Sequence, residues 1–148
     1  MTVEASSQVD TDSRTVTPVQ VILIVPDDPI IGELIEFVID DEDGWVAELA
    51  DSTDHAIEIM RQGRADALIV DVPFDGGLDE DLLVELQSAR VGRAAPVVLL
   101  SSIFRREIQS AVDRGLAAAC IEAPLDIDDL VSTVRRTLDR ERFQSVLV

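Results

Sequence analysis

Five short apolar runs, separated by amphipathic segments, constrain the fold of this chain more than any other feature. The first run, residues 19–25, is rich in β-branched side chains and stops at the turn sequence of residues 26–29. A run of this length between turn residues is typical of a strand buried on both faces. Four further runs of the same kind follow at residues 45–50, 65–71, 96–100 and 117–121.

The segments between these runs have the periodicity of helices. In the first segment, Ile31, Leu34, Ile35 and Val38 follow the spacing i, i+3, i+4, i+7 and predict one buried stripe. In the last segment, Asp126 is the expected N-cap. Strict alternation of strand and helix predicts a parallel sheet with helices on both faces. We therefore expect an α/β, doubly wound, flavodoxin-like (βα)5 fold with the strand order 2-1-3-4-5.

The length of 148 residues is that of a single domain. Residues 1–18 are predicted to be a flexible acidic arm, residues 19–142 the domain, and residues 143–148 an apolar C-terminal tail. The sequence has no apolar run of membrane length and no signal peptide, and its single cysteine, Cys120, excludes an internal disulfide. We therefore expect a cytoplasmic protein.

The charge of the chain excludes two classes of partner. There are 30 Asp and Glu residues against 12 Lys and Arg residues, the net charge is −18, and every one of the 12 cations is an arginine. Binding to nucleic acid or to an anionic membrane requires clustered basic residues, so neither partner is expected. Adaptation to salt and a GC-rich genome are both open as explanations of this acidic, lysine-free composition.

Acidic and hydroxyl side chains lie where the predicted strands end. Asp27 and Asp28 follow the first strand, Asp71 ends the third, and Ser101 and Ser102 follow the fourth, where either is expected to cap the next helix. Ligands of doubly wound folds bind at this edge of the sheet. Clustered carboxylates there would bind a hard cation such as Mg²⁺ or take up a proton, and solvated strand-end residues remain the alternative.

Four segments in the right order and spacing resemble the receiver domain of response regulators, of the CheY-like superfamily. The resemblance runs from about Val19 to Arg142. It is carried by the opening strand with its acidic turn, the strand that ends in an aspartate, the strand that ends in a hydroxyl pair, and the strand that leads into a proline. These segments are residues 22–29, 67–71, 96–102 and 115–124.

The resemblance implies a role for several of these residues. Asp71 falls on the phospho-acceptor, whose carboxylate would form an acyl phosphate. Asp27 falls on a magnesium ligand, and the backbone carbonyl of Pro73 on another, with Asp28 one residue beyond the usual position. Ser101 falls on the hydroxyl that contacts the phosphoryl group. The implied cofactor is Mg²⁺, with no organic cofactor.

Two positions depart from the pattern of the family. Pro26 replaces the first residue of the acidic pair, and Ala123 stands where the family has a lysine that pairs with the phosphoryl oxygens. A phosphoryl group on Asp71 would bring a charge of about −1.5 to −2 beside Asp27 without that cation. We therefore expect an atypical member of the family, a pseudo-receiver with impaired or absent phosphorylation.

The first hypothesis for function is a stand-alone receiver domain, not an enzyme, that acts in signal transduction by protein–protein contact. The second is a working phospho-acceptor that is phosphorylated on Asp71 with Mg²⁺ in a two-component phosphorelay. A flavodoxin-like enzyme or ligand binder is a third, but the sequence has no glycine-rich phosphate loop and no nucleophile elbow.

The partners expected under the first two hypotheses are proteins, such as a histidine kinase or a downstream regulator. The resemblance also implies a surface, made by the fourth helix, fifth strand and fifth helix, that a partner or a second copy would use. The candidate contact residues are Arg105, Arg106, Arg135 and Arg136, and the last two are expected to lie at the end of the last helix.

Overall fold

Five parallel strands form the sheet of this protein in the order β2-β1-β3-β4-β5, as the sequence predicts. The computed structural model describes residues 19–73, 77–89, 95–102, 106–122 and 125–147. The strands are β1 (Gln20–Val25), β2 (Trp45–Leu49), β3 (Ala67–Asp71), β4 (Val97–Ser101) and β5 (Ala119–Glu122). β1 and β3 lie side by side, so the chain reverses its direction of winding between them.

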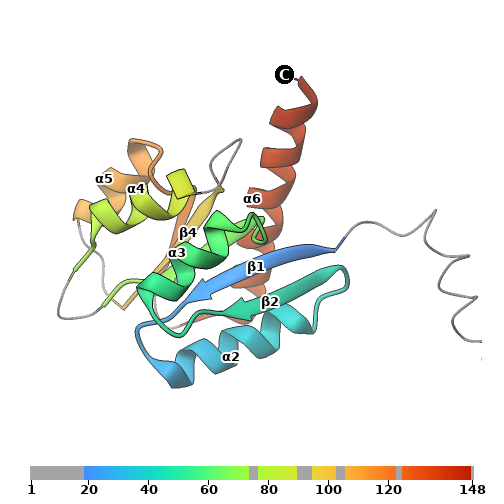
Figure 1. Cartoon of the computed structure of the whole chain (residues 1–148), viewed down its shortest axis with the longest axis horizontal. Coiled ribbons are helices and arrows are strands. Elements are labelled where there is room, and N and C mark those ends of the chain that lie inside the picture. The colour runs from blue at the N-terminus through green and yellow to red at the C-terminus, as the bar shows by residue number, and fades with distance from the viewer. Residues whose placement is uncertain (1–18, 74–76, 90–94, 103–105, 123–124, 148) are drawn as a thin grey trace, which may run out of the picture.

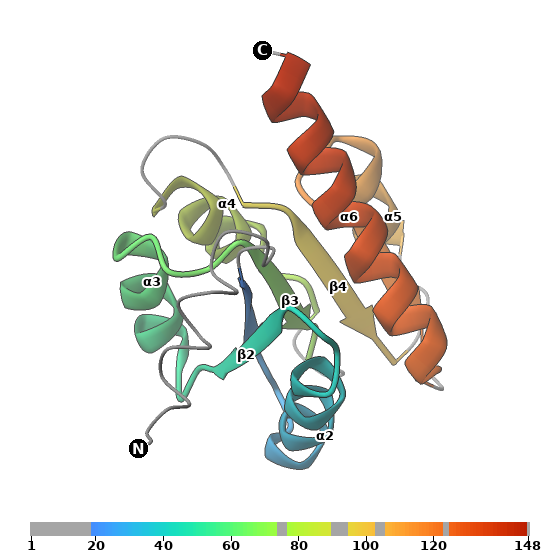
Figure 2. The same cartoon turned by 90° about the vertical axis from the view of Figure 1, so that its right-hand side faces the viewer.

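Alternate residues of the central strands pack into two separate cores, one on each face of the sheet. In β1, Ile22 and Ile24 join one core, whereas Leu23 and Val25 join the other. The first core is covered by α2 and α6, and the second by α3, α4 and α5 (Figures 1 and 2). Because both faces are buried, these strands are almost wholly apolar, which is why they were visible as apolar runs.

The helices are α2 (Pro29–Asp40), α3 (Thr53–Arg61), α4 (Glu80–Ala89), α5 (Arg106–Asp113) and α6 (Ile127–Leu147). The predicted cap of the last helix is confirmed, because the Asp126 carboxylate accepts hydrogen bonds from the backbone N–H groups of Asp128 and Asp129 at 2.9 and 3.2 Å. Within the described part of the chain, no helix is both long and apolar enough to cross a membrane.

Two expectations about the helices are wrong. Residues 143–147 continue α6 and do not form a separate tail, since nothing after Pro124 in the sequence breaks a helix. Arg135 and Arg136 consequently lie in the middle of that helix, away from its C-terminal dipole. Ser101 is the last residue of β4, and the cap expected at Ser101 or Ser102 is not tested, because residues 103–105, which precede α5, lie outside the described residues.

The predicted stripe of α2 is also wrong at one position. Leu34 is 42% exposed, and the buried residues of the helix are Gly32, Ile35, Val38 and Ile39. Gly32 explains this orientation, because a Cβ atom built on it would lie 2.8 Å from the Cβ atom of Pro26. Only glycine lets the helix approach the end of β1 so closely, and this contact selects the face that packs on the sheet.

Candidate functional site

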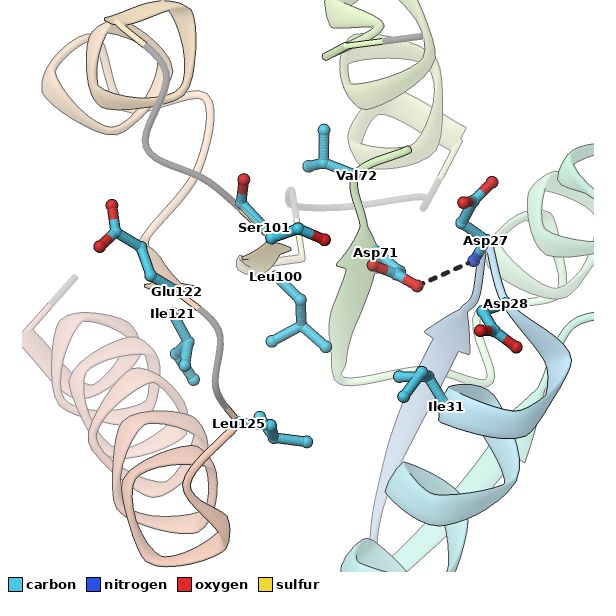
Figure 3. Close-up of a pocket in the computed structure, with 11 residues that line it drawn as sticks. Asp27, Asp28, Ile31, Asp71, Val72, Leu100, Ser101, Ile121, Glu122 and Leu125 are labelled. Carbon is cyan, nitrogen blue, oxygen red and sulfur yellow. Dashed lines mark hydrogen bonds between the residues drawn. The ribbon is translucent and has the colours of Figure 1, made fainter. Parts of the chain in front are cut away.

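The carboxyl ends of the strands surround a cavity of about 290 Å³. Asp71 is the last residue of β3, Ser101 of β4 and Glu122 of β5, and Asp27 follows β1 by one intervening residue. The strand register places Ser101 opposite Glu122. Figure 3 shows Asp27, Asp28 and Asp71 on one side of this cavity and Glu122 on the other. The predicted convergence of strand-end residues is therefore confirmed.

Asp71 is the most perturbed carboxyl group of the site. Its Oδ2 atom accepts a hydrogen bond from the backbone N–H of Asp27 at 3.2 Å (Figure 3). Burial raises the pKa of Asp71 above its ordinary value, and the negative charges of Asp27 and Asp28 raise it further. Hydrogen bonds from the backbone of the same two residues oppose this rise. The net effect is a carboxylate that binds a proton more readily than an exposed aspartate does.

Asp28 has a structural role in addition to its position near Asp71. It is the N-cap of α2, and its Oδ1 atom accepts a hydrogen bond from the backbone N–H of Ile30 at 2.9 Å. Asp27 contacts Asp71 through its backbone, and its side chain is exposed. Pro26 is held between the end of β1 and Gly32. The turn after β1 thus brings two carboxylates to the cavity.

The cavity has an apolar floor that the sequence motifs did not reveal. Ile31, Val72, Leu100, Ile121 and Leu125 line it together with the polar residues. Their identity as apolar strand and helix residues was plain in the sequence, but nothing there indicated that their side chains meet at the strand ends. Ser101 also lines the cavity and is only 5% exposed.

No arginine or histidine is among the described residues that line this cavity, and the chain has no lysine. Ala123, which stands at the position of the family lysine, lies outside the described residues, as does Arg105. The described lining therefore combines four carboxylates, two serines and an aliphatic floor.

The described carboxylates fit a magnesium ion incompletely. Within the described ranges, no group of three or more Asp, Glu, His or Cys residues is arranged to hold a metal ion. Asp27 and Asp71 line this cavity and also a second hollow of about 240 Å³, which Pro73 lines as well. The ligand set implied by the resemblance thus lacks a third carboxylate.

The arginines predicted as a contact surface have different environments. Arg135 donates to Glu42 Oε1 at 2.7 Å, and its guanidinium lies 4.8 Å from the centre of the Trp45 ring. Arg136 donates to the hydroxyl of Thr133 at 3.1 Å, and Arg106 is exposed at the start of α5. Arg135 therefore ties α6 to the turn between α2 and β2, a contact that sequence spacing did not predict.

The comparison with known sequences points to regulatory proteins. No protein-family model matches the chain. A probable transcriptional regulatory protein of Mycobacterium tuberculosis, TcrX, is 30% identical over 128 residues, a match that covers 84% of this chain and 52% of TcrX. The chain therefore spans about half the length of this relative.

Several solved structures with a similar fold are response-regulator receiver domains. NtrX from Brucella abortus, solved in complex with ADP, is 26% identical with a TM-score of 0.73, and the match covers 87% of this chain and 28% of NtrX. A CheY-like response regulator receiver domain from Methanospirillum hungatei has a TM-score of 0.73 at 19% identity, with 85% of this chain and 98% of that one covered. Together with the strand order, these likenesses show that the chain has the fold of CheY-like response-regulator receiver domains.

Proposed function

We propose that this protein is an atypical response-regulator receiver domain that regulates a partner by protein–protein contact, with impaired phosphorylation of Asp71. The likeness to TcrX and NtrX supports a role in two-component signalling. Impaired phosphorylation is supported by the charge of the cavity, where Asp71 lies beside two other carboxylates and no described cation.

The electrostatic argument concerns the phosphorylated state. A phosphoryl group would replace one negative charge on Asp71 by about −1.5 to −2. Each unit charge about 4 Å away interacts with it by roughly 4 kcal/mol at an effective dielectric constant near 20. The raised pKa of Asp71 supports this argument, because the site already disfavours a single negative charge there.

The missing cations strengthen the same conclusion. The alanine at position 123 supplies no ammonium group, and the chain contains no other lysine. Pro26 leaves the turn after β1 with Asp27 and the capping residue Asp28 as its carboxylates. We infer that Mg²⁺ binds weakly to Asp27, Asp71 and the carbonyl of Pro73, and that it neutralises little of the added charge.

A second candidate is a working phospho-acceptor. Asp71 lines two hollows and has Ser101 in the lining of one of them, which favours access of a small phosphodonor to its carboxylate. In this case a carboxylate oxygen of Asp71 would attack the phosphorus atom, the bond between phosphorus and the donor would break with departure of the donor's leaving group, and Ser101 would contact the transferred phosphoryl group. A histidine kinase would then be the physiological donor.

One experiment separates the two candidates. The full chain is incubated with Mg²⁺ and acetyl phosphate, and its intact mass is measured beside that of Asp71→Asn and Ala123→Lys. We expect wild type to stay essentially unmodified and Ala123→Lys to gain phosphate, because the new ammonium group offsets the added charge. Ready, stoichiometric phosphorylation of wild type that Asp71→Asn abolishes would establish the second candidate instead.

The proposal of an atypical receiver domain also includes a location, a statement on enzymatic activity and a class of partner. We place the protein in the cytoplasm and assign it no enzymatic activity of its own. Its partner is a histidine kinase or a downstream regulator, and homodimerisation through α5, β5 and α6 is the alternative use of its surface.

A further inference from the structure

A third cavity lies at the edge of the sheet opposite to the Asp71 site. Its volume is about 370 Å³, against about 290 and 240 Å³ for the two hollows beside Asp71. It is lined where β4 and β5 begin, by residues from the last turns of α4 and α5 and from the middle of α6. We call it the amino-edge cavity, after the amino ends of these two strands.

The lining of the amino-edge cavity differs in charge from the rest of the molecule. The chain has 30 acidic residues against 12 basic ones, and both hollows beside Asp71 contain carboxylates. The described lining of the amino-edge cavity contains no carboxylate and one cation, Arg140. Its larger apolar side chains are those of Pro96, Val97 and Val112. An occupant that matches this lining carries a negative charge on an apolar body.

Arg140 is able to pair with such an occupant. It is exposed on α6, and no ion pair joins it to a carboxylate among the described side chains. Arg64, Arg114 and Arg135, by contrast, each pair with a glutamate. A guanidinium presents its N–H donors in a planar fork that fits the two oxygens of a carboxylate.

The two other polar side chains of the cavity offer acceptors. Gln87 Nε2 donates to the backbone carbonyl of Leu116 at 2.8 Å, and the hydroxyl of Thr137 donates to the backbone carbonyl of Thr133 at 2.8 Å. Because a donor of each group is engaged in this way, the side-chain oxygen of each keeps capacity to accept a hydrogen bond. A hydroxyl group on the occupant would supply the matching donor.

The charge of the whole chain selects among anions. A net charge of −18 repels a phosphate dianion more strongly than a carboxylate monoanion. A volume of about 370 Å³ is within the range of small-molecule sites. We propose that the amino-edge cavity binds a small organic carboxylate with a flat apolar body and a hydroxyl group, its carboxylate paired with Arg140. This site adds a ligand to the regulator proposed above and does not involve Asp71.

The test uses 4-hydroxybenzoate as the probe, because it combines a carboxylate, a flat ring and a hydroxyl group. Two matched compounds each lack one feature: 4-hydroxybenzamide has a neutral amide in place of the carboxylate, and acetate has no ring. Binding to the full chain is measured by shifts of backbone amide signals in NMR. We expect 4-hydroxybenzoate to shift the signals of Val97, Gly115 and Ala118. It should bind at least about tenfold more tightly than either matched compound.

Variants at the cavity make the result specific. Arg140→Gln should weaken binding of 4-hydroxybenzoate at least about tenfold, through loss of the charged pair. Arg136→Gln is the matched control, because Arg136 is exposed on the same helix and does not belong to the described lining. Ala118→Leu keeps the charge but places a larger side chain in the lining, and it should also weaken binding. The NMR spectrum of each variant without ligand verifies that it is folded.

Four results would overturn the inference. These are absence of shifts up to the solubility limit of 4-hydroxybenzoate, equal affinity for 4-hydroxybenzamide, equal affinity for acetate, and binding that survives Arg140→Gln undiminished. Shifts centred on Asp27 and Ser101 would assign the probe to the Asp71 cavity and also refute it. None of these results depends on whether Asp71 accepts phosphate, so the two proposals fail separately.

Discussion

The contact between Gly32 and Pro26 predicts a measurable loss of stability in the variant Gly32→Ala. The added Cβ atom would lie 2.8 Å from Cβ and 3.1 Å from Cγ of Pro26, and 3.1 Å from Cδ1 of Leu49. The Leu49 side chain is able to rotate away, but the proline ring is fixed to the backbone at the end of β1. The helix must therefore shift as a whole.

The size of the effect follows from two opposing contributions. Overpacking of a buried site costs about 1–3 kcal/mol, and replacing glycine by alanine within a helix returns about 1 kcal/mol. Because the closest neighbour is a proline ring that cannot rotate away, we take the upper half of the overpacking range, about 2–3 kcal/mol, and expect a net loss of about 1–2 kcal/mol in the free energy of unfolding. For a domain of this size, that loss lowers Tm by about 3–8 °C.

The assay is thermal and urea unfolding followed by circular dichroism, in a double-mutant cycle with Pro26→Gly. In the Pro26→Gly background the clash is absent, so Gly32→Ala should be neutral or stabilising there. A loss of stability that persists in that background, or an unchanged stability of Gly32→Ala alone, would refute the assignment of α2 orientation to this contact.

Three further predictions concern single side chains. The folded protein raises the pKa of Asp71 above 3.8, so the stability that the protonated form contributes is lost as the pH rises. Asp71→Asn should therefore raise the free energy of unfolding at neutral pH. In urea titrations at several pH values, the variant should also show a smaller fall of stability with rising pH than wild type. Arg135→Ala should lower the unfolding free energy by about 1 kcal/mol, through loss of the Glu42 and Trp45 contacts, with Arg136→Ala near neutral as the control. Burial raises the pKa of Cys120 from 9.0 to about 11, so the folded protein should hold roughly a hundredfold less thiolate and react with a thiol reagent far more slowly than the urea-unfolded chain. Equal rates in the two states would contradict the last prediction.

The fold was predictable because its strands are buried on both faces. Runs such as residues 67–71 leave few alternatives to a parallel sheet, and the flavodoxin-like order 2-1-3-4-5 is one that fits five βα units. The orientation of α2 was harder to predict. Its sequence is apolar on nearly all sides, so periodicity alone did not distinguish Leu34 from Ile39 as the buried residue. That choice depends on the approach of Gly32 to Pro26, two residues in different elements.

The acidic part of the site was predictable for a related reason. Topology alone brings the ends of β1 and β3 together, and so it places Asp27 beside Asp71. The details that change the chemistry depend on local geometry. The use of Asp28 as a helix cap and the presence of both Ile31 and Leu125 in the lining of the cavity depend on side-chain positions that residue spacing does not contain.

Asp28 makes α2 and Asp71 thermodynamically dependent on each other. Its carboxylate caps the first turn of α2, and Asp28 acts on the pKa of Asp71 in two opposite ways, because its backbone hydrogen bond lowers that pKa and its charge raises it. A ligand that displaces the start of α2 therefore changes the proton affinity of Asp71. By reciprocity, proton uptake at Asp71 changes the affinity of that ligand by the same factor.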